Sequence, residues 1–254
     1  MNKKPYIISI GILIIFFIVM FLVFGLDNIK KDSYSTTIVL GKNSVFGLRK
    51  QNWYRLADYS EINWKKYDIY ENNEKIGKYY LWFDDKWYAF DNNRDPIDIG
   101  IRFLGIRTNY KIDLVDFKTE DVDSSTYIDK VLNDNKLPSD SKFTSKYKVD
   151  LDFDKDGVEE EFYIISNAFI NNENPEKIFS IAFMVKDDTI YPMYTDIRKN
   201  TSLNGCKPYF NAFLNVDDKD GYEVIISCSE YSNSKTTDMI YKYEKNSFKI
   251  LISN

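Results

Sequence analysis

The sequence predicts a mostly β protein that begins with an N-terminal transmembrane helix. After this helix we expect an antiparallel β meander, a short α-helix and a region of two repeated β-hairpin units. Three observations lead to this prediction. An uncharged apolar run lies near the N-terminus, segments rich in aromatic and β-branched residues alternate with turn sequences, and two similar acidic segments lie 63 residues apart.

The apolar run extends from residue 6 to residue 26 and contains no charged residue. About 20 apolar residues let a helix cross the hydrocarbon core of a bilayer, and neither a small-residue cleavage site nor a nearby cysteine follows this run. We therefore predict an uncleaved signal-anchor, rather than a cleaved signal peptide or a buried core helix. Two lysines before the run favour a cytoplasmic stub at residues 1–5, and two lysines just beyond it weaken this bias. The predicted location is the plasma membrane, with a single pass and residues 27–254 outside the cytoplasm.

Residues 27–37 are polar and are expected to form a tether. Between residues 38 and 118, segments rich in aromatic residues alternate with turns rich in Asn and Asp, which predicts the β meander. The tryptophans of this region fit two interpretations, the core of a small sheet or a sugar-binding platform, and the core is the more common use of such residues. They are Trp53, Trp64, Trp82 and Trp87.

Residues 119–141 are predicted as a linker with a short helix from Thr126 to Leu137. Ser124 and Ser125 supply the N-cap, and Pro138 follows the end of the helix. One face of this helix is apolar and consists of Tyr127, Ile128, Val131 and Leu132.

Residues 142–254 are predicted as the two-repeat β region, and its main feature is the acidic segment 150–161. Seven acidic residues and one lysine give this segment a formal charge of −6. Asp152, Asp154 and Asp156 alternate, and a glycine and then Glu160 follow them. Ca²⁺ is bound by several converging carboxylate oxygens, with a glycine at the sharp turn. The pattern therefore predicts a calcium site, and the alternative is an acidic, solvated hairpin turn.

The segment is not an EF-hand loop, because Tyr163 stands where the closing glutamate would be and strands are predicted on both sides. It resembles instead the D-x-D-x-D-G-x-x-E calcium loops of FG-GAP (integrin-type) and VCBS repeats, over roughly a dozen residues. Two units cannot close a propeller of the FG-GAP type, so we expect a compact β domain packed on the first sheet. The resemblance implies a structural Ca²⁺ ion, with side-chain ligands from Asp152, Asp154, Asp156 and Glu160 and a backbone carbonyl ligand from Val158.

A degenerate second copy of the acidic loop spans residues 215–223. Asn215 replaces the first aspartate, Lys219 places a positive charge at a ligand position, and the glycine comes one residue late. We therefore expect this second loop to bind metal poorly, although strands follow it in the same pattern as in the first copy.

The two cysteines of the chain, Cys206 and Cys228, permit a disulfide in an exported domain. A simple hairpin centred on Lys219 would place Cys228 opposite Phe210, so a bend near Pro208 is needed to bring the two thiols together. The alternative is one buried thiol and one loop thiol.

The composition excludes some catalytic sites and argues against one class of partner. The chain has no histidine, which excludes Ser-His-Asp triads and His-zinc sites, and its net charge of −5 argues against a nucleic acid partner. We predict a membrane-anchored extracytoplasmic β-protein with a structural calcium loop, which binds a protein or a cell-envelope polymer or serves as an accessory subunit. The alternative is a carboxylate-dependent, glycosidase-like envelope hydrolase. We assign no catalytic or cofactor-binding residue, and we prefer the binding role to the enzyme.

Overall fold

The computed structural model describes residues 34–41, 44–100, 102–168, 177–199, 205–216, 221–230 and 235–254. Residues Ser35–Asn254 form one compact unit. The predicted stub, the signal-anchor at 6–26 and most of the tether lie outside the described residues. In the part of the chain that is described, no helix has the length and apolar character needed to cross a bilayer.

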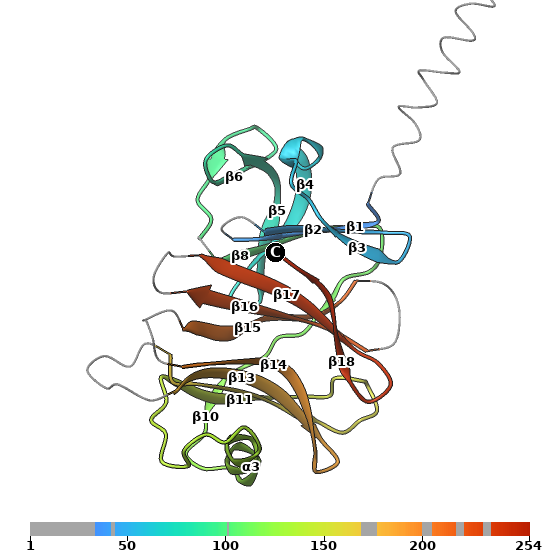
Figure 1. Ribbon diagram of the computed structural model, residues 1–254. Coiled ribbons are helices and arrows are strands. Elements are labelled where there is room, and N and C mark those ends of the chain that lie inside the picture. The colour runs from blue at the N-terminus through green and yellow to red at the C-terminus, as the bar shows by residue number, and fades with distance from the viewer. Residues whose placement is uncertain are drawn as a thin grey trace, which may run out of the picture. The chain divides into compact units, whose positions relative to one another are not determined.

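The unit is mostly β, as predicted, and its N-terminal part is an eight-stranded antiparallel sheet (Figure 1). This N-terminal sheet has the strand order β3-β2-β1-β8-β4-β5-β6-β7. A 3₁₀ helix, η2 (Tyr59–Glu61), precedes β4. The strands are β1 (Thr36–Leu40), β2 (Ser44–Arg49), β3 (Asn52–Arg55), β4 (Lys65–Glu71), β5 (Glu74–Phe83), β6 (Trp87–Phe90), β7 (Pro96–Ile97) and β8 (Phe103–Thr108).

The N-terminal sheet differs from the predicted meander, because β8 lies between β1 and β4 and pairs with both of them. All five residues of β1 are buried, so this strand needs a neighbour on each side to satisfy its backbone groups. Strand β1 also begins at Thr36, within the segment predicted as the tether.

Each of the two repeats forms a four-stranded antiparallel meander. The first-repeat sheet contains β11 (Ser145–Leu151), β12 (Glu160–Ser166), β13 (Lys177–Lys186) and β14 (Thr189–Lys199), with β10 (Glu120–Asp121) beside β11. The second-repeat sheet contains β15 (Cys206–Asn215), β16 (Glu223–Glu230), β17 (Thr236–Tyr243) and β18 (Phe248–Ser253), with β9 (Asp113–Leu114) beside β15. The same strand order in both sheets agrees with the 63-residue spacing in the sequence.

The second-repeat sheet lies between the other two sheets, and both of its faces are buried (Figure 1). Adjacent residues of a strand point to opposite faces. Ile226 accordingly packs in the core shared with the first-repeat sheet, and Ile225 packs in the core shared with the N-terminal sheet. Packing of the repeat region on the first sheet was predicted, and the apolar runs on both faces of β16 account for it.

The interface between the N-terminal and second-repeat sheets also holds a buried carboxylate. Asp238 accepts hydrogen bonds from the hydroxyls of Ser44 and Ser227, which lie on different sheets. Burial raises the pKa of Asp238 above its ordinary value, although the two hydroxyls oppose this shift. A raised pKa in the folded state means that the contribution of Asp238 to stability is present at acidic pH and is lost as the pH rises through that pKa.

Helix α3 (Thr126–Asp134) covers the outer face of the first-repeat sheet (Figure 1). The Ser125 hydroxyl caps its N-terminus by accepting a hydrogen bond of 3.2 Å from the Tyr127 backbone N–H. The helix ends three residues before the predicted Leu137, because Lys136 adopts a left-handed φ of 54° that stops it. The predicted apolar face is present, with Ile128, Val131 and Leu132 buried.

The tryptophans differ in burial, which tests only the first of the two interpretations given above. Trp87 is buried, as expected for a core residue, whereas Trp64 is 43% exposed. The Trp64 ring contacts the Trp82 ring at 5.4 Å between centroids, and the Arg94 guanidinium carbon lies 5.4 Å from the Trp64 centroid. The region therefore supplies both core and surface aromatics.

Candidate metal centre

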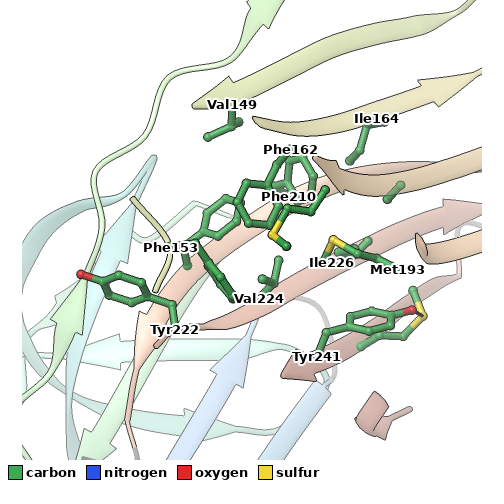
Figure 2. Packing of buried hydrophobic residues seen from close by; sticks show 14 of the residues in the cluster. Val149, Phe153, Phe162, Ile164, Met193, Phe210, Tyr222, Val224, Ile226 and Tyr241 are labelled. Carbon is green, nitrogen blue, oxygen red and sulfur yellow. Dashed lines mark hydrogen bonds between the residues drawn. The ribbon is translucent and has the colours of Figure 1, made fainter. Parts of the chain in front are cut away.

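The predicted calcium loop connects β11 to β12 at one end of the first-repeat sheet. Phe153, the second residue of the loop, is 2% exposed and points into the core between the two repeat sheets (Figure 2). Its ring lies 5.1 Å from that of Phe162 and 6.2 Å from that of Tyr222, between centroids. Burial of this ring fixes the path of the loop, so that the alternate aspartates are held on the opposite side of the backbone.

The three aspartates of the motif come together. One carboxylate oxygen from each of Asp152, Asp154 and Asp156 lies within 4.8 Å of the others. The Asp152 Oδ2 atom accepts a hydrogen bond of 3.1 Å from the Gly157 backbone N–H, and Gly157 has a φ of +90° that favours glycine. The Oδ1 atoms of Asp152 and Asp154 are buried and have no hydrogen-bond partner among the described residues. Buried carboxylate oxygens without a donor fit a hard cation, which would satisfy them.

Glu160, the fourth predicted ligand, is 1% exposed and also forms a hydrogen bond to the backbone of the loop. Its Oε2 atom accepts a hydrogen bond of 2.8 Å from the Phe153 backbone N–H. This bond closes the base of the loop, and it leaves Oε1 as the oxygen that can face the aspartates. The fifth predicted ligand, the carbonyl of Val158, belongs to a residue whose side chain is 60% exposed at the loop tip.

Lys186 is the residue at this site that sequence reasoning missed. Its Nζ atom lies 2.5 Å from Asp154 Oδ2, 2.8 Å from Asp156 Oδ2 and 2.9 Å from Glu160 Oε1. The lysine comes from the end of β13, where it stands next in register after the pair Glu161–Val185 and therefore opposite Glu160. Lys186 lies outside the acidic segment in the sequence, and only the pairing of β12 with β13 shows its position.

The ion pairs at this site shift two pKa values. Burial lowers the pKa of Lys186, but the hydrogen bonds to Asp154, Asp156 and Glu160 outweigh it and raise this pKa above its ordinary value. Lys186 is therefore charged at neutral pH. The hydrogen bond from Lys186, together with that from the Val158 backbone N–H, lowers the pKa of Asp156. The stabilisation from Asp156 is consequently present above its ordinary pKa and is lost as the pH falls through the lowered value.

Two further lysines near the loop form ion pairs. Lys148 on β11 forms ion pairs with Asp150 at 2.8 Å and with Glu161 at 3.0 Å. Lys155 points away from the aspartates and pairs with Asp113 of the second-repeat sheet at 2.6 Å, where it lowers the pKa of the Asp113 carboxyl. The formal charge of −6 counted from the segment alone therefore overstates the excess, because Lys148 and Lys186 lie on neighbouring strands outside it.

The second copy of the loop keeps the buried glutamate of the first copy, but Asn215 and Lys219 stand in place of Asp152 and Asp156. Glu223 is 1% exposed, its Oε2 atom accepts from the Val216 backbone N–H at 3.4 Å, and its Oε1 atom pairs with Lys242 at 3.0 Å. Val216 lies 63 residues after Phe153, and Glu223 lies 63 residues after Glu160. Lys219, which is expected to weaken metal binding by this loop, lies outside the described residues. In both repeats a buried glutamate joins a loop backbone N–H to a lysine of the following strand.

Cys206 and Cys228 are joined by a disulfide with a Cα–Cα distance of 5.5 Å, and both are buried. The register differs from that of the simple hairpin considered above, because Cys228 pairs with Pro208 and not with Phe210. A bulge between Phe210 and Ala212 changes the register along β15, and such a shift follows from the paired backbones rather than from the sequence pattern.

Comparison of the chain with protein-family models, with curated proteins and with solved structures found no match.

Proposed function

We propose that this chain is a membrane-anchored extracytoplasmic β-protein in which the loop at 152–160 binds a structural Ca²⁺ ion. The observation that carries the calcium proposal is the convergence of Asp152, Asp154 and Asp156, with two buried carboxylate oxygens that lack a donor. Carboxylate oxygens are the preferred ligands of Ca²⁺, and the resemblance to FG-GAP and VCBS loops supports the same choice.

The proposed ion and Lys186 compete for the carboxylates of Asp154, Asp156 and Glu160. Asp152, Asp154 and Asp156 offer side-chain ligands, Val158 offers a carbonyl, and Glu160 offers the Oε1 atom that Lys186 now contacts. A doubly charged ion at this position gains more from the carboxylates than the single charge of an ammonium, but it must displace that ammonium. The competition lowers the affinity for Ca²⁺, which suits the 10⁻⁴–10⁻³ M dissociation constants of extracellular calcium modules.

Replacing Lys186 by methionine is expected to strengthen Ca²⁺ binding about tenfold, which corresponds to about 1.4 kcal/mol. The substitution removes the competing charge and keeps a flexible apolar stem of similar length. Without Ca²⁺ the same variant should be less stable than the wild type, because three carboxylates lose their shared counter-charge. Isothermal titration of the detergent-solubilised chain with CaCl₂ measures the affinity.

The matched control is Lys148→Met, which removes a lysine that pairs with Asp150 and Glu161 but touches none of the predicted ligands. It should leave the Ca²⁺ affinity within about twofold of the wild type, as expected for a partly exposed ion pair. An affinity for Ca²⁺ in Lys186→Met that does not exceed the wild-type value would remove the proposed competition.

The proposed biological role is that of an envelope-associated binding or accessory protein. The apolar run at 6–26 serves as a single-pass anchor in the plasma membrane, with the N-terminus in the cytoplasm and residues 27–254 outside. The partner is a protein or a cell-envelope polymer rather than a nucleic acid, given the formal net charge of −5. Outside the cell Ca²⁺ is abundant, so a weak calcium loop and an exported domain fit together.

This location predicts that proteinase K added to intact cells degrades the chain, while the undigested chain sediments with membranes and resists carbonate extraction. The uncharged run at 6–26 would hold the chain in the bilayer, and the polar residues beyond it would be accessible from outside. A cytoplasmic protein measured in the same cells controls for lysis. Recovery of the full-length chain from the cytosol or the medium is the result that would refute the topology.

A further inference from the structure

A cavity of about 820 Å³ lies where the three sheets meet, away from the metal centre. The first-repeat sheet contributes Tyr147 to its wall, the second-repeat sheet contributes Lys207 and Tyr209, and Arg102 reaches it from the segment before β8. A second cavity of about 500 Å³ shares Arg102 and Tyr209 with the first, so the two adjoin and are here together called the seam groove. Each of the two cavities has the size of pockets that hold small organic ligands.

Three exposed cations line the seam groove, Arg102 and Lys207 in the first cavity and Lys118 in the second. The Arg102 guanidinium carbon lies 5.2 Å from the centroid of the Tyr209 ring, and among the described residues neither Arg102 nor Lys207 forms an ion pair. The lysines around the metal centre differ, because Lys148, Lys155 and Lys186 each contact carboxylates. An arginine held against a ring keeps its five N–H donors in a fixed plane, which suits a carboxylate or a phosphate.

The remaining groups of the groove favour a ligand rich in hydroxyls. The side chains of Asp121 and Asp123 line it as exposed carboxylates. Carboxylates accept hydrogen bonds from hydroxyls, but they repel the closely spaced phosphates of a nucleic acid. Asn72, Asn73 and Asn211 add amide groups, which both donate and accept. The half-buried side chains of Tyr147 and Tyr209 also line the groove and add partly apolar surface. Cations, acceptors and aromatic rings together fit an acidic sugar better than a nucleic acid.

We propose that the seam groove binds an acidic carbohydrate, whose carboxylate or phosphate group is held by Arg102 and Lys207 while Asp121 and Asp123 accept from its hydroxyls. The proposal names the ligand class for the envelope-binding role given above and rests on that role. Arg102 and Lys207, which form no ion pair with a described residue, would each gain a counter-charge from the anionic group of the ligand.

The test is a titration of the detergent-solubilised full-length chain with four probes of similar length. They are an oligogalacturonate, which carries carboxylates, a phosphorylated oligosaccharide, a neutral malto-oligosaccharide and a single-stranded oligonucleotide. We expect at least one acidic saccharide to bind, and the neutral saccharide to bind at least tenfold more weakly. The acidic probe that binds identifies the anionic group. Failure of both acidic saccharides to bind, equal binding of the neutral one, or tighter binding of the oligonucleotide would each overturn the proposal.

Variants locate the binding to the groove. Arg102→Ala should weaken binding of the acidic saccharide at least tenfold, and Lys207→Glu should weaken it further than Lys207→Ala. The matched control is Arg94→Ala, which removes another arginine stacked on an aromatic ring, that of Trp64, on a surface outside the groove. Undiminished binding by both Arg102→Ala and Lys207→Glu, or an equal loss in Arg94→Ala, would show that the saccharide binds elsewhere.

One further variant separates this proposal from that of the calcium site. Asp154→Asn should abolish the response of the melting temperature to Ca²⁺ and leave the saccharide affinity within about twofold of the wild type, because Asp154 does not line the groove. A wild-type chain that binds the acidic saccharide but does not respond to Ca²⁺ would contradict the calcium proposal alone. A chain that responds to Ca²⁺ but binds neither acidic saccharide would contradict the groove proposal alone.

Discussion

Replacement of Glu160 by alanine is expected to lower the free energy of unfolding by about 3 kcal/mol, the lower part of the range for breaking a buried ion pair. The side chain is 1% exposed and joins the Phe153 backbone N–H to the Lys186 ammonium. Its removal leaves the buried Phe153 N–H without an acceptor. Lys186 still pairs with Asp154 and Asp156, which limits the loss of stability. Urea unfolding of the solubilised chain, followed by tryptophan fluorescence in EDTA, measures the change.

Two variants serve as controls for Glu160→Ala. Glu159 is exposed and adjacent, so Glu159→Ala should change the free energy of unfolding by less than about 0.5 kcal/mol. Glu223 occupies the equivalent place in the second repeat and pairs with Lys242, so Glu223→Ala should cost a similar amount to Glu160→Ala. If Glu160→Ala were no more destabilising than Glu159→Ala, the glutamate would not support the loop as described.

Removal of both cysteines in a Cys206→Ala, Cys228→Ala variant is expected to cost about 3 kcal/mol of stability, and to lower the melting temperature by about 6–12 °C. The disulfide joins residues 22 positions apart, and its loss releases this loop in the unfolded chain. Both residues are buried between the repeat sheets, so the smaller side chains also remove apolar contacts.

The pairing itself is tested by alkylation in urea, which exposes thiols that burial would protect. The chain isolated from membranes should incorporate no alkylating reagent without a reductant, and two equivalents after reduction, because an exported disulfide stays oxidised. Incorporation of two equivalents without a reductant would show that Cys206 and Cys228 are free thiols in the protein as it exists.

The features that were predictable from the sequence are those encoded over short distances. The repeat was visible because each copy carries its own loop, strands and turns, and helix α3 was visible because Ser125 and the spacing of Ile128, Val131 and Leu132 are local signals. The three aspartates were predicted for the same reason, since a single tight turn brings them together.

The features that were not predictable depend on pairing between distant segments. Strand β8 joins β1 through pairs such as Ile38–Ile106, and nothing near either residue specifies the other. Lys186 reaches the candidate metal centre only because β13 returns beside β12 after a ten-residue connection. The seam groove arises where three sheets meet, so no single stretch of sequence contains it.

The melting temperature of the wild-type chain in EDTA and in several millimolar Ca²⁺ tests the calcium site most directly. With a dissociation constant near 0.1 mM and about 1 mM Ca²⁺, binding to the folded state alone adds about 1.4 kcal/mol. For a chain of this size we expect a rise of about 3–6 °C, absent in Asp154→Asn and Asp156→Asn and retained in Asp217→Asn of the second loop. An identical wild-type melting temperature in EDTA and in Ca²⁺ would contradict the proposal, and the loop would then be an acidic turn whose counter-ion is Lys186.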